Sequence, residues 1–142
     1  MKVTYSDLKN KRVFISGGGS GIGATIVEYF CEQKSEVYFI DIDLKSSNKL
    51  IKKIKKNGFR VPKFIECNIL DVKKLQNIIK DIISKKGTIH CLINSAANDD
   101  RHTTEQVDEK YWENRMGINL KHYFFAAQAV VKGMKKIKSG SI

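Results

Sequence analysis

The sequence is poor in cysteine, in arginine and in long apolar runs, and each shortage excludes a class of protein. Its three cysteines, Cys31, Cys67 and Cys91, show no C-x-x-C spacing, so we expect buried, reduced thiols with neither a disulfide nor a metal site. No apolar run approaches the ~20 residues that span a bilayer, and residues 1–11 lack the apolar segment of a signal peptide. We therefore expect a cytoplasmic protein without a membrane partner.

Arginine is scarce among the basic residues, and this bears on the choice of partner. The chain has 22 lysines against 4 arginines and a net charge of +11, a balance that also suits a nucleic-acid binder. However, most lysines fall on the polar sides of helical patterns, and recognition of bases and phosphates favours arginine. We expect solvated helix faces and no nucleic-acid partner, with a lysine-rich nucleic-acid binder as a remaining alternative.

The chain does contain a glycine-rich turn between an apolar run and a helical pattern. Ser16-Gly17-Gly18-Gly19-Ser20-Gly21-Ile22-Gly23 follows the apolar residues 13–15 and opens a helical pattern that runs from Ile22 to Phe30. Strand, glycine turn and helix start are the parts of a dinucleotide phosphate site, because backbone N–H groups and the helix dipole attract an anion there. The residues expected to contact the pyrophosphate are Gly17, Ser20, Gly21, Ile22 and Gly23.

Strand and helix patterns alternate along the chain. This order predicts an α/β fold, a Rossmann-type doubly wound parallel sheet with helices on both faces, in one domain of residues 1–142. The carboxyl ends of the strands then line one crevice. The first helix is expected to turn Ile22, Ile26 and Val27 inward. We expect strands at 12–16, 36–41, 63–67 and 89–94, and helices at 22–30, 44–56, 72–86 and 109–137, the last broken in pattern at Gly117 and Gly133.

Polar residues at two strand ends are candidates for the adenosine side of that crevice. Asp41 ends the second strand, 20 residues after Gly21, where a carboxylate can accept hydrogen bonds from both ribose hydroxyls. The same charge repels a 2′-phosphate, so it favours NAD over NADP; Asp43 is the alternative carboxylate. Asn68 ends the third strand and either contacts adenine or only forms a turn.

The ordered motifs of the chain resemble those of the short-chain dehydrogenase/reductases. They are the glycine turn, Asp41, Asn94-Ser95-Ala96-Ala97 and Ile118-Asn119-Leu120. The resemblance runs from Arg12 onward and implies a nicotinamide cofactor, the strand order 3-2-1-4, and Asn94 and Ala96 on the nicotinamide side. It also implies that Asn119 is catalytic, holding a water in a proton relay, whereas the residue alone suggests a mid-helix Asn bonded to its own backbone. The family's Asn-Asn-Ala-Gly is changed at two positions here, and we expect NAD binding to survive both changes.

The family's other catalytic residues have no counterpart in this chain. By resemblance the catalytic serine lies on a strand that would begin near Ser141-Ile142, with a Tyr-x-x-x-Lys pair beyond it. The literal Tyr5…Lys9 match precedes the first strand, far from the crevice. The helix at 109–137 carries more apolar surface than four strands can cover, and its family counterpart packs between subunits. We therefore expect an incomplete NAD-binding domain, the cofactor half of a homo-oligomeric enzyme, inactive alone.

A polar loop follows the fourth strand where a substrate would reach the nicotinamide. Residues 98–102 are Asn-Asp-Asp-Arg-His, and such a set suits a polyhydroxylated substrate, because an unpaired buried polar group is costly. The surrounding run resembles members that oxidise aldoses, which implies hydride transfer between NAD and a sugar-like hydroxyl. For the chain, the alternatives are a non-catalytic NAD-binding or interaction module and a 3-oxoacyl-reductase-like member. For the loop alone, the alternative is a solvated surface loop without a substrate role. We expect His90 within a strand and His122 on a helix surface.

Overall fold

The computed structural model describes residues 3–142, and their strands form a parallel sheet with the order β3-β2-β1-β4. This is the strand order that the family resemblance implied. The last two strands are shorter than expected, although Cys67 N still donates to Asp41 O at 3.0 Å and His90 N to Arg12 O at 2.8 Å just outside them. The strands are β1 (Arg12–Ser16), β2 (Glu36–Asp41), β3 (Lys63–Glu66) and β4 (Cys91–Asn94).

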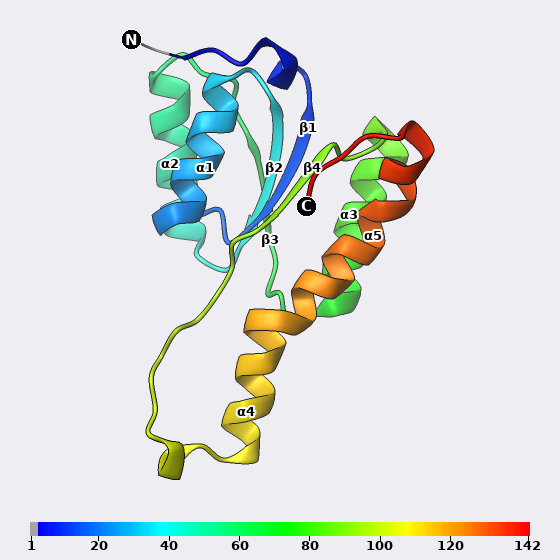
Figure 1. Ribbon diagram of the computed structural model, residues 1–142. Coiled ribbons are helices and arrows are strands. Elements are labelled where there is room, and N and C mark those ends of the chain that lie inside the picture. Colours follow the sequence, from blue (N-terminus) through cyan, green and yellow to red (C-terminus); the bar gives the residue numbers. More distant parts are fainter. Residues whose placement is uncertain (1–2) are drawn as a thin grey trace.

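Helices cover both faces of the sheet, as predicted for a doubly wound fold (Figure 1). Because side chains alternate along a strand, Val13 and Ile15 pack under α1 and α2, and Phe14 packs under α3 and α5. The helices are α1 (Gly21–Glu32), α2 (Leu44–Lys56), α3 (Val72–Lys86), α4 (Glu109–Met116) and α5 (His122–Ile137), with short 3₁₀ turns at Ser6–Leu8 and Thr104–Gln106.

The expected long helix is interrupted by a π-helical turn (Gly117–Lys121) between α4 and α5. Gly117 is buried, and a Cβ there would lie 2.7 Å from Leu70 Cδ2, so glycine allows the close approach. The break expected at Gly133 is wrong, since that residue lies inside α5. Figure 1 shows α4 and the loop before it extending well beyond the sheet.

Three expectations about burial are wrong. Cys91 is only partly buried, whereas Cys31 and Cys67 are buried as expected. Ile22 is 78% exposed, because it lies in the first turn of α1, which overhangs the ends of the strands. His122 is 0% exposed instead of lying on a helix surface, since it faces Ser16 of β1. The three cysteines are free, and burial raises the pKa of the Cys31 thiol to about 12. Between residues 3 and 142, none of the helices is both long and apolar enough to pass through a bilayer.

The last residues of the chain lie along the outer edge of β4. Ser141 forms a parallel bridge with Cys91, in which Ser141 N donates to His90 O at 3.0 Å and Leu92 N donates to Ser141 O at 2.9 Å. The bridge lies where the resemblance places the start of a fifth strand.

Candidate cofactor crevice

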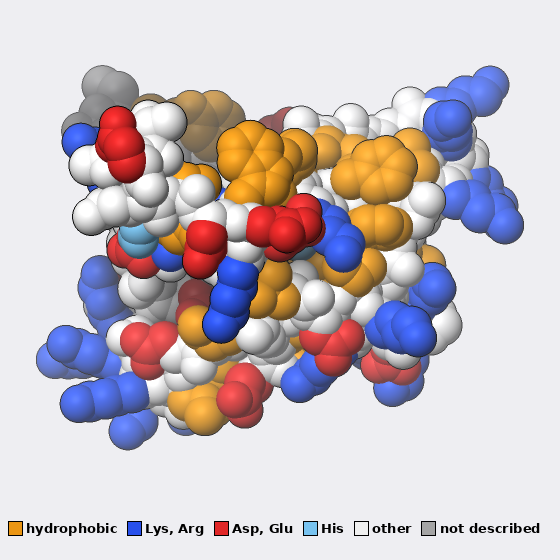
Figure 2. All heavy atoms as spheres, turned by 90° about the horizontal axis from the view of Figure 1, so that it is seen from below, with side chains coloured by type: hydrophobic (Ala, Val, Ile, Leu, Met, Phe, Trp, Pro, Cys, Tyr) orange, Lys and Arg blue, Asp and Glu red, His pale blue; other side chains and the backbone are white. Residues whose placement is uncertain are grey.

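A crevice of about 690 Å³ opens at the carboxyl ends of the strands, the end from which Figure 2 views the molecule. Its volume lies within the range of small-molecule and cofactor sites. Lysines and arginines lie mostly around the rim in this view, and hydrophobic side chains gather nearer the middle. The lining residues are Gly17, Ser20, Gly21, Ile22, Gly23, Asp41, Ile42, Asp43, Cys67, Asn68, Ile69, Ser95, Ala96, Ala97, Asn98, Asp99 and Ile118.

The glycine turn forms the first wall of the crevice from main-chain atoms. Gly17 has a φ of +70° and donates to Ile40 O at 2.9 Å, which fixes the turn onto the end of β2. A Cβ on Gly17 would lie 2.6 Å from Ala96 Cα, and a Cβ on Gly23 would overlap the Gly17 carbonyl oxygen. A side chain at Gly17 would therefore push the turn away from Ala96, and a side chain at Gly23 would push α1 away from the turn.

The start of α1 suits an anion. Ser20 occupies the N-cap position with extended backbone and makes no side-chain cap hydrogen bond. Within residues 3–142, the first-turn amides of Gly21, Ile22 and Gly23 therefore have no capping side chain. Amides at a helix start without such a partner, together with the helix dipole, attract a negative group. These residues line the crevice, and they fit the pyrophosphate of a dinucleotide.

The two candidate carboxylates, Asp41 and Asp43, make different hydrogen bonds. Asp41 braces the glycine turn, with Oδ2 accepting from Gly19 N at 2.8 Å and Oδ1 accepting from Asp43 N at 2.9 Å. An ionised carboxylate has lone pairs for further donors, and Asp41 borders the crevice. Asp43 caps α2 by accepting from Ser46 N at 2.9 Å, and its hydrogen bonding with Ser46 lowers the pKa of Asp43. Asp41 is thus the carboxylate not used as a helix cap.

Of the two asparagines predicted to contact the cofactor, Asn68 borders the crevice and Asn94 does not. Asn68 borders the crevice, while its Oδ1 accepts from Leu70 N at 3.0 Å in a turn. Asn94 is not among the lining residues, and its Oδ1 is buried without a hydrogen-bond partner in the described part of the chain. The next residues, Ser95 to Asn98, line the crevice instead. These residues follow directly after a strand, and this position in the sequence could have predicted that they line the crevice.

The loop of residues 95–98, here the β4 exit loop, forms the second wall and is held by side chains. Asn119 Oδ1 accepts from Asn98 N at 2.8 Å, and Asn119 Nδ2 donates to Asn98 O at 2.9 Å. Tyr123 donates its hydroxyl to Ala96 O at 3.3 Å. Asn119 therefore bonds to the backbone of the loop and not to that of its own helix, and its neighbour Ile118, not Asn119, lines the crevice.

The polar loop beyond residue 98 is fastened to α4. Tyr111 donates its hydroxyl to Asp100 O at 2.7 Å, and Arg115 Nη2 donates to Asp100 Oδ2 at 3.0 Å. The Arg115 guanidinium lies 4.9 Å from the centroid of the Tyr111 ring, and the His102 ring lies 4.0 Å from it. Asp99, the neighbour of Asp100 in this loop, lines the crevice, so the fastened loop places a carboxylate at its edge.

The literal Tyr-x-x-x-Lys match lies away from the crevice. Tyr5 N donates to Gln33 Oε1 at 2.8 Å, just beyond the carboxyl end of α1. The crevice is at the opposite, amino end of that helix.

A parallel sheet of this order, with a glycine turn between β1 and α1, defines a Rossmann-type α/β domain. A family model for short chain dehydrogenases matches residues 11–142, and the chain belongs to that family. It is 38% identical over 138 residues to the probable galactose dehydrogenase GalD of Rhizobium meliloti, and equally to a D-xylose 1-dehydrogenase of Caulobacter vibrioides. The fold of a putative short-chain dehydrogenase/reductase from Burkholderia xenovorans is similar, with a TM-score of 0.88 at 21% identity over 96% of this chain and 55% of that one.

The chain spans about half the length of the curated relatives it matches. Each of the two sugar dehydrogenases aligns with 97% of this chain but with only 54% of its own length.

Proposed function

We propose that the chain is the NAD-binding half of an oxidoreductase that transfers hydride between NAD and a hydroxyl-bearing carbon of a sugar-like substrate. The observation that carries the proposal is the pairing, in one crevice, of an uncapped helix start with Asp41, which is not used as a helix cap. The first suits a diphosphate and the second suits ribose hydroxyls.

Each part of the cofactor has a proposed partner. Gly17, Ser20, Gly21, Ile22 and Gly23 hold the pyrophosphate, Asp41 holds the adenosine ribose, and Asn68 lies near the adenine. Ala96 and Asn94 belong to the nicotinamide side, with Asn94 acting from beneath the β4 exit loop. When bound, the nicotinamide supplies the hydride chemistry at C4. Asn119 is the proposed catalytic residue of this chain, holding a water in the proton relay.

The substrate proposal rests on the loop beyond the β4 exit loop. Asp99 faces the crevice, and Asp100 is held in place by Tyr111 and Arg115. Polar groups on a loop held in place suit a molecule that pairs with them through several hydroxyls better than an apolar chain that would leave them unpaired. The names of the two relatives, a galactose and a xylose dehydrogenase, support an aldose.

The remaining active-site residues and the subunit contacts are proposed to lie with other parts of the enzyme. We propose that the serine and the Tyr-x-x-x-Lys pair of the family complete the site in a cytoplasmic homo-oligomer, and that this chain alone has no turnover. An exposed apolar row on α4, the π-helical turn and α5 supports burial between subunits. Its members are Trp112, Met116, Leu120 and Phe124, between 36% and 64% exposed.

The cofactor is tested by titrating the chain with NADH and NADPH and following nicotinamide fluorescence or heat. We expect NADH to bind more tightly than NADPH. Asp41→Ala should weaken NADH binding roughly tenfold, as expected for a lost hydrogen-bonding charged group, and should narrow the difference between the two cofactors.

Asp43→Ala is the matched control, because it removes a carboxylate from the same rim but one that caps α2. It should cost about 1 kcal/mol of stability and leave the preference for NADH intact. A folded chain that ignores both cofactors at millimolar concentration would refute the proposal, and an unchanged preference in Asp41→Ala would remove Asp41 from its role.

A further inference from the structure

A fully buried histidine lies behind the second wall of the crevice, and the proposed function does not use it. His122 begins α5 and is 0% exposed. Its Nε2 lies 3.4 Å from Ser16 Oγ at the end of β1. Its ring meets the Tyr123 ring edge-on, with centroids 4.3 Å apart. His122 therefore joins the start of α5 to the strand end from which the glycine turn departs.

The hydrogen bonds around Ser16 determine which way its hydroxyl points. Ser16 Oγ accepts from Ser95 N at 3.2 Å, an N–H shared with the Ser16 carbonyl, and from Ala96 N at 3.4 Å. A serine hydroxyl has two acceptor positions and one proton, so these two amides leave it only as a donor. The acceptor that the described residues place at this hydroxyl is His122 Nε2.

This arrangement indicates the state of the imidazole. An Nε2 that accepts from Ser16 carries no proton, so the neutral ring has its proton on Nδ1, a buried atom without a hydrogen-bond partner among the described residues. Burial lowers the pKa of His122, against a smaller opposing effect of the Ile118 carbonyl, which agrees with a neutral ring. A charged imidazole would direct an N–H at a hydroxyl whose acceptor positions are already filled.

We propose that His122 is a positioning residue for the nicotinamide side of the crevice, acting through the Ser16 hydroxyl on the amides of Ser95 and Ala96. The inference rests on the proposed function, because that proposal places Ala96 on the nicotinamide side of the crevice. The exit loop is then held from two directions. Tyr123 holds the Ala96 carbonyl, and the His122–Ser16 pair holds the two N–H groups.

The test compares NADH with ADP-ribose, which has the same adenosine diphosphate end but no nicotinamide. His122→Phe keeps the ring and removes the acceptor. It should weaken NADH binding roughly tenfold, as for a buried hydroxyl left without its acceptor, and change ADP-ribose binding less than about twofold. His122→Gln offers a side-chain oxygen near the Nε2 position and should restore NADH binding. A merely structural role would lower both affinities together.

Ser16→Ala supplies a second route that stays decisive even where His122→Phe does not fold. It should show the same selective loss of NADH binding. Adding His122→Phe to it should cost little more, because His122 acts through that hydroxyl. Equal losses for both ligands, or additive losses in the double variant, would overturn the role of His122. A wild-type chain that binds neither NADH nor ADP-ribose would instead overturn the proposed cofactor site.

Discussion

The two walls of the crevice are built in different ways. The glycine turn is made of main-chain atoms within a few residues of one another, and Gly17 and Gly23 are pressed against neighbouring backbone. The β4 exit loop is held instead by side chains that are distant in sequence. Asn119 lies 21 positions from Asn98, and Ser16 lies 80 positions from Ala96.

This difference predicts that the two walls respond differently to substitution. At Gly17 and Gly23 the first wall has no space for added atoms, so enlarging either residue should be severe even when no hydrogen bond is lost. The second wall depends on hydrogen bonds between partly exposed groups, each contributing about 1 kcal/mol net, so removing one should be mild. Variants of the two walls therefore separate the contribution of close packing from that of hydrogen bonding.

The largest effect is expected at Gly23. A Cβ in Gly23→Ala would overlap the Gly17 carbonyl oxygen, so α1 must shift away from the turn. We expect a loss of about 3 kcal/mol in unfolding free energy, at the upper end of overpacking costs, and a fall in NADH affinity of roughly a hundredfold. Urea denaturation and NADH titration measure the two.

Gly58→Ala is the control for the added methyl group. Gly58 has a φ of +72°, unlike the helical Gly23, and a Cβ there meets no atom within 4 Å. It should cost about 1–2 kcal/mol of strain and leave NADH affinity unchanged. If Gly23→Ala bound NADH as well as Gly58→Ala does, close packing would not be what shapes the first wall.

A smaller effect is expected at Asn119. Asn119→Ala removes both hydrogen bonds to the Asn98 backbone, but water can replace them at this exposed position. We therefore expect a loss of about 1 kcal/mol in unfolding free energy, measured by urea denaturation. Asn119→Asp keeps the acceptor and should lose less. The control Asn114→Ala changes an exposed residue of α4 and should be neutral or slightly stabilising through helix propensity. A loss above about 3 kcal/mol in Asn119→Ala would contradict the mildness expected of the second wall.

The first wall could be predicted from the sequence because its determinants are local. The glycine spacing, the apolar strand before it and the carboxylate 20 residues later are all sequence patterns. The predicted residues of this wall that line the crevice are Gly17, Ser20, Gly21, Ile22, Gly23 and Asp41. The alternation of strands and helices likewise predicted the doubly wound sheet. The family resemblance supplied its strand order.

The second wall could not be predicted in detail because its partners meet only in the folded chain. A helical pattern places His122 on a surface, whereas the turn at Gly117–Lys121 leads into a helix that buries it against Ser16. Asn94 and Ala96 were both expected to line the crevice; Ala96 does so, but Asn94 does not. No spacing in the sequence indicates that Asn119 bonds to Asn98, since that pairing depends on where the π-helical turn lies beside the loop.

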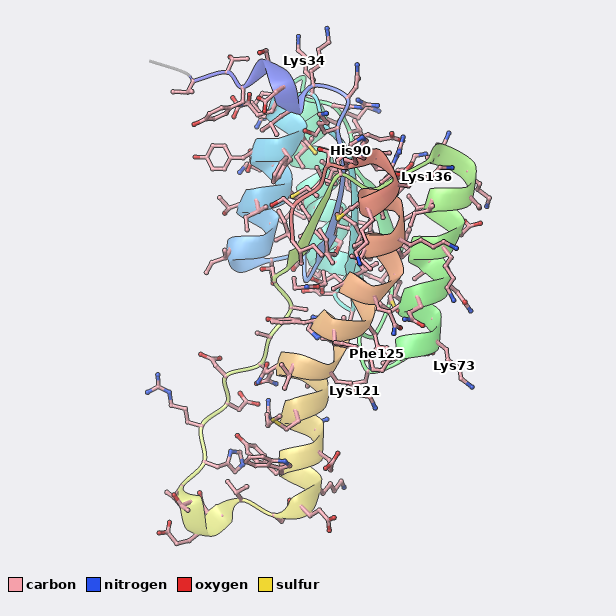
Figure 3. All side chains as sticks on the ribbon, turned by 45° about the vertical axis from the view of Figure 1, so that its right-hand side comes forward. Lys34, Lys73, His90, Lys121, Phe125 and Lys136 are labelled. Atoms are coloured by element: carbon pink, nitrogen blue, oxygen red, sulfur yellow. The ribbon has the colours of Figure 1, made fainter. Side chains whose placement is uncertain are left out.

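The smallest effect expected is on the pH dependence of stability and of NADH binding. It should distinguish His122 from His90, a second histidine that lies far from the crevice. His90 lies at the end of the molecule away from α4 (Figure 3), and its Nδ1 accepts from Arg12 N at 3.0 Å. Burial, followed by the charges of Lys11 and Arg12, lowers the pKa of His90, and burial lowers the pKa of His122.

Both folded pKa values therefore lie below the ordinary value of 6.5. As pH falls below about 6.5 the unfolded chain binds protons that the folded chain does not, so unfolding free energy falls with pH until the folded pKa values are reached. His90→Asn and His122→Gln should each remove part of this slope. We also expect NADH binding to weaken as pH falls and His122 takes up a proton, because a charged ring can no longer accept from Ser16. Only His122→Gln should flatten this weakening, because His90 is remote from the crevice. Titrations with NADH between pH 5.5 and 7.5, chosen to bracket that ordinary pKa, measure this. If the loss of NADH affinity at low pH persisted in His122→Gln but disappeared in His90→Asn, protonation of His90 and not of His122 would be its cause. That outcome would contradict the role of His122.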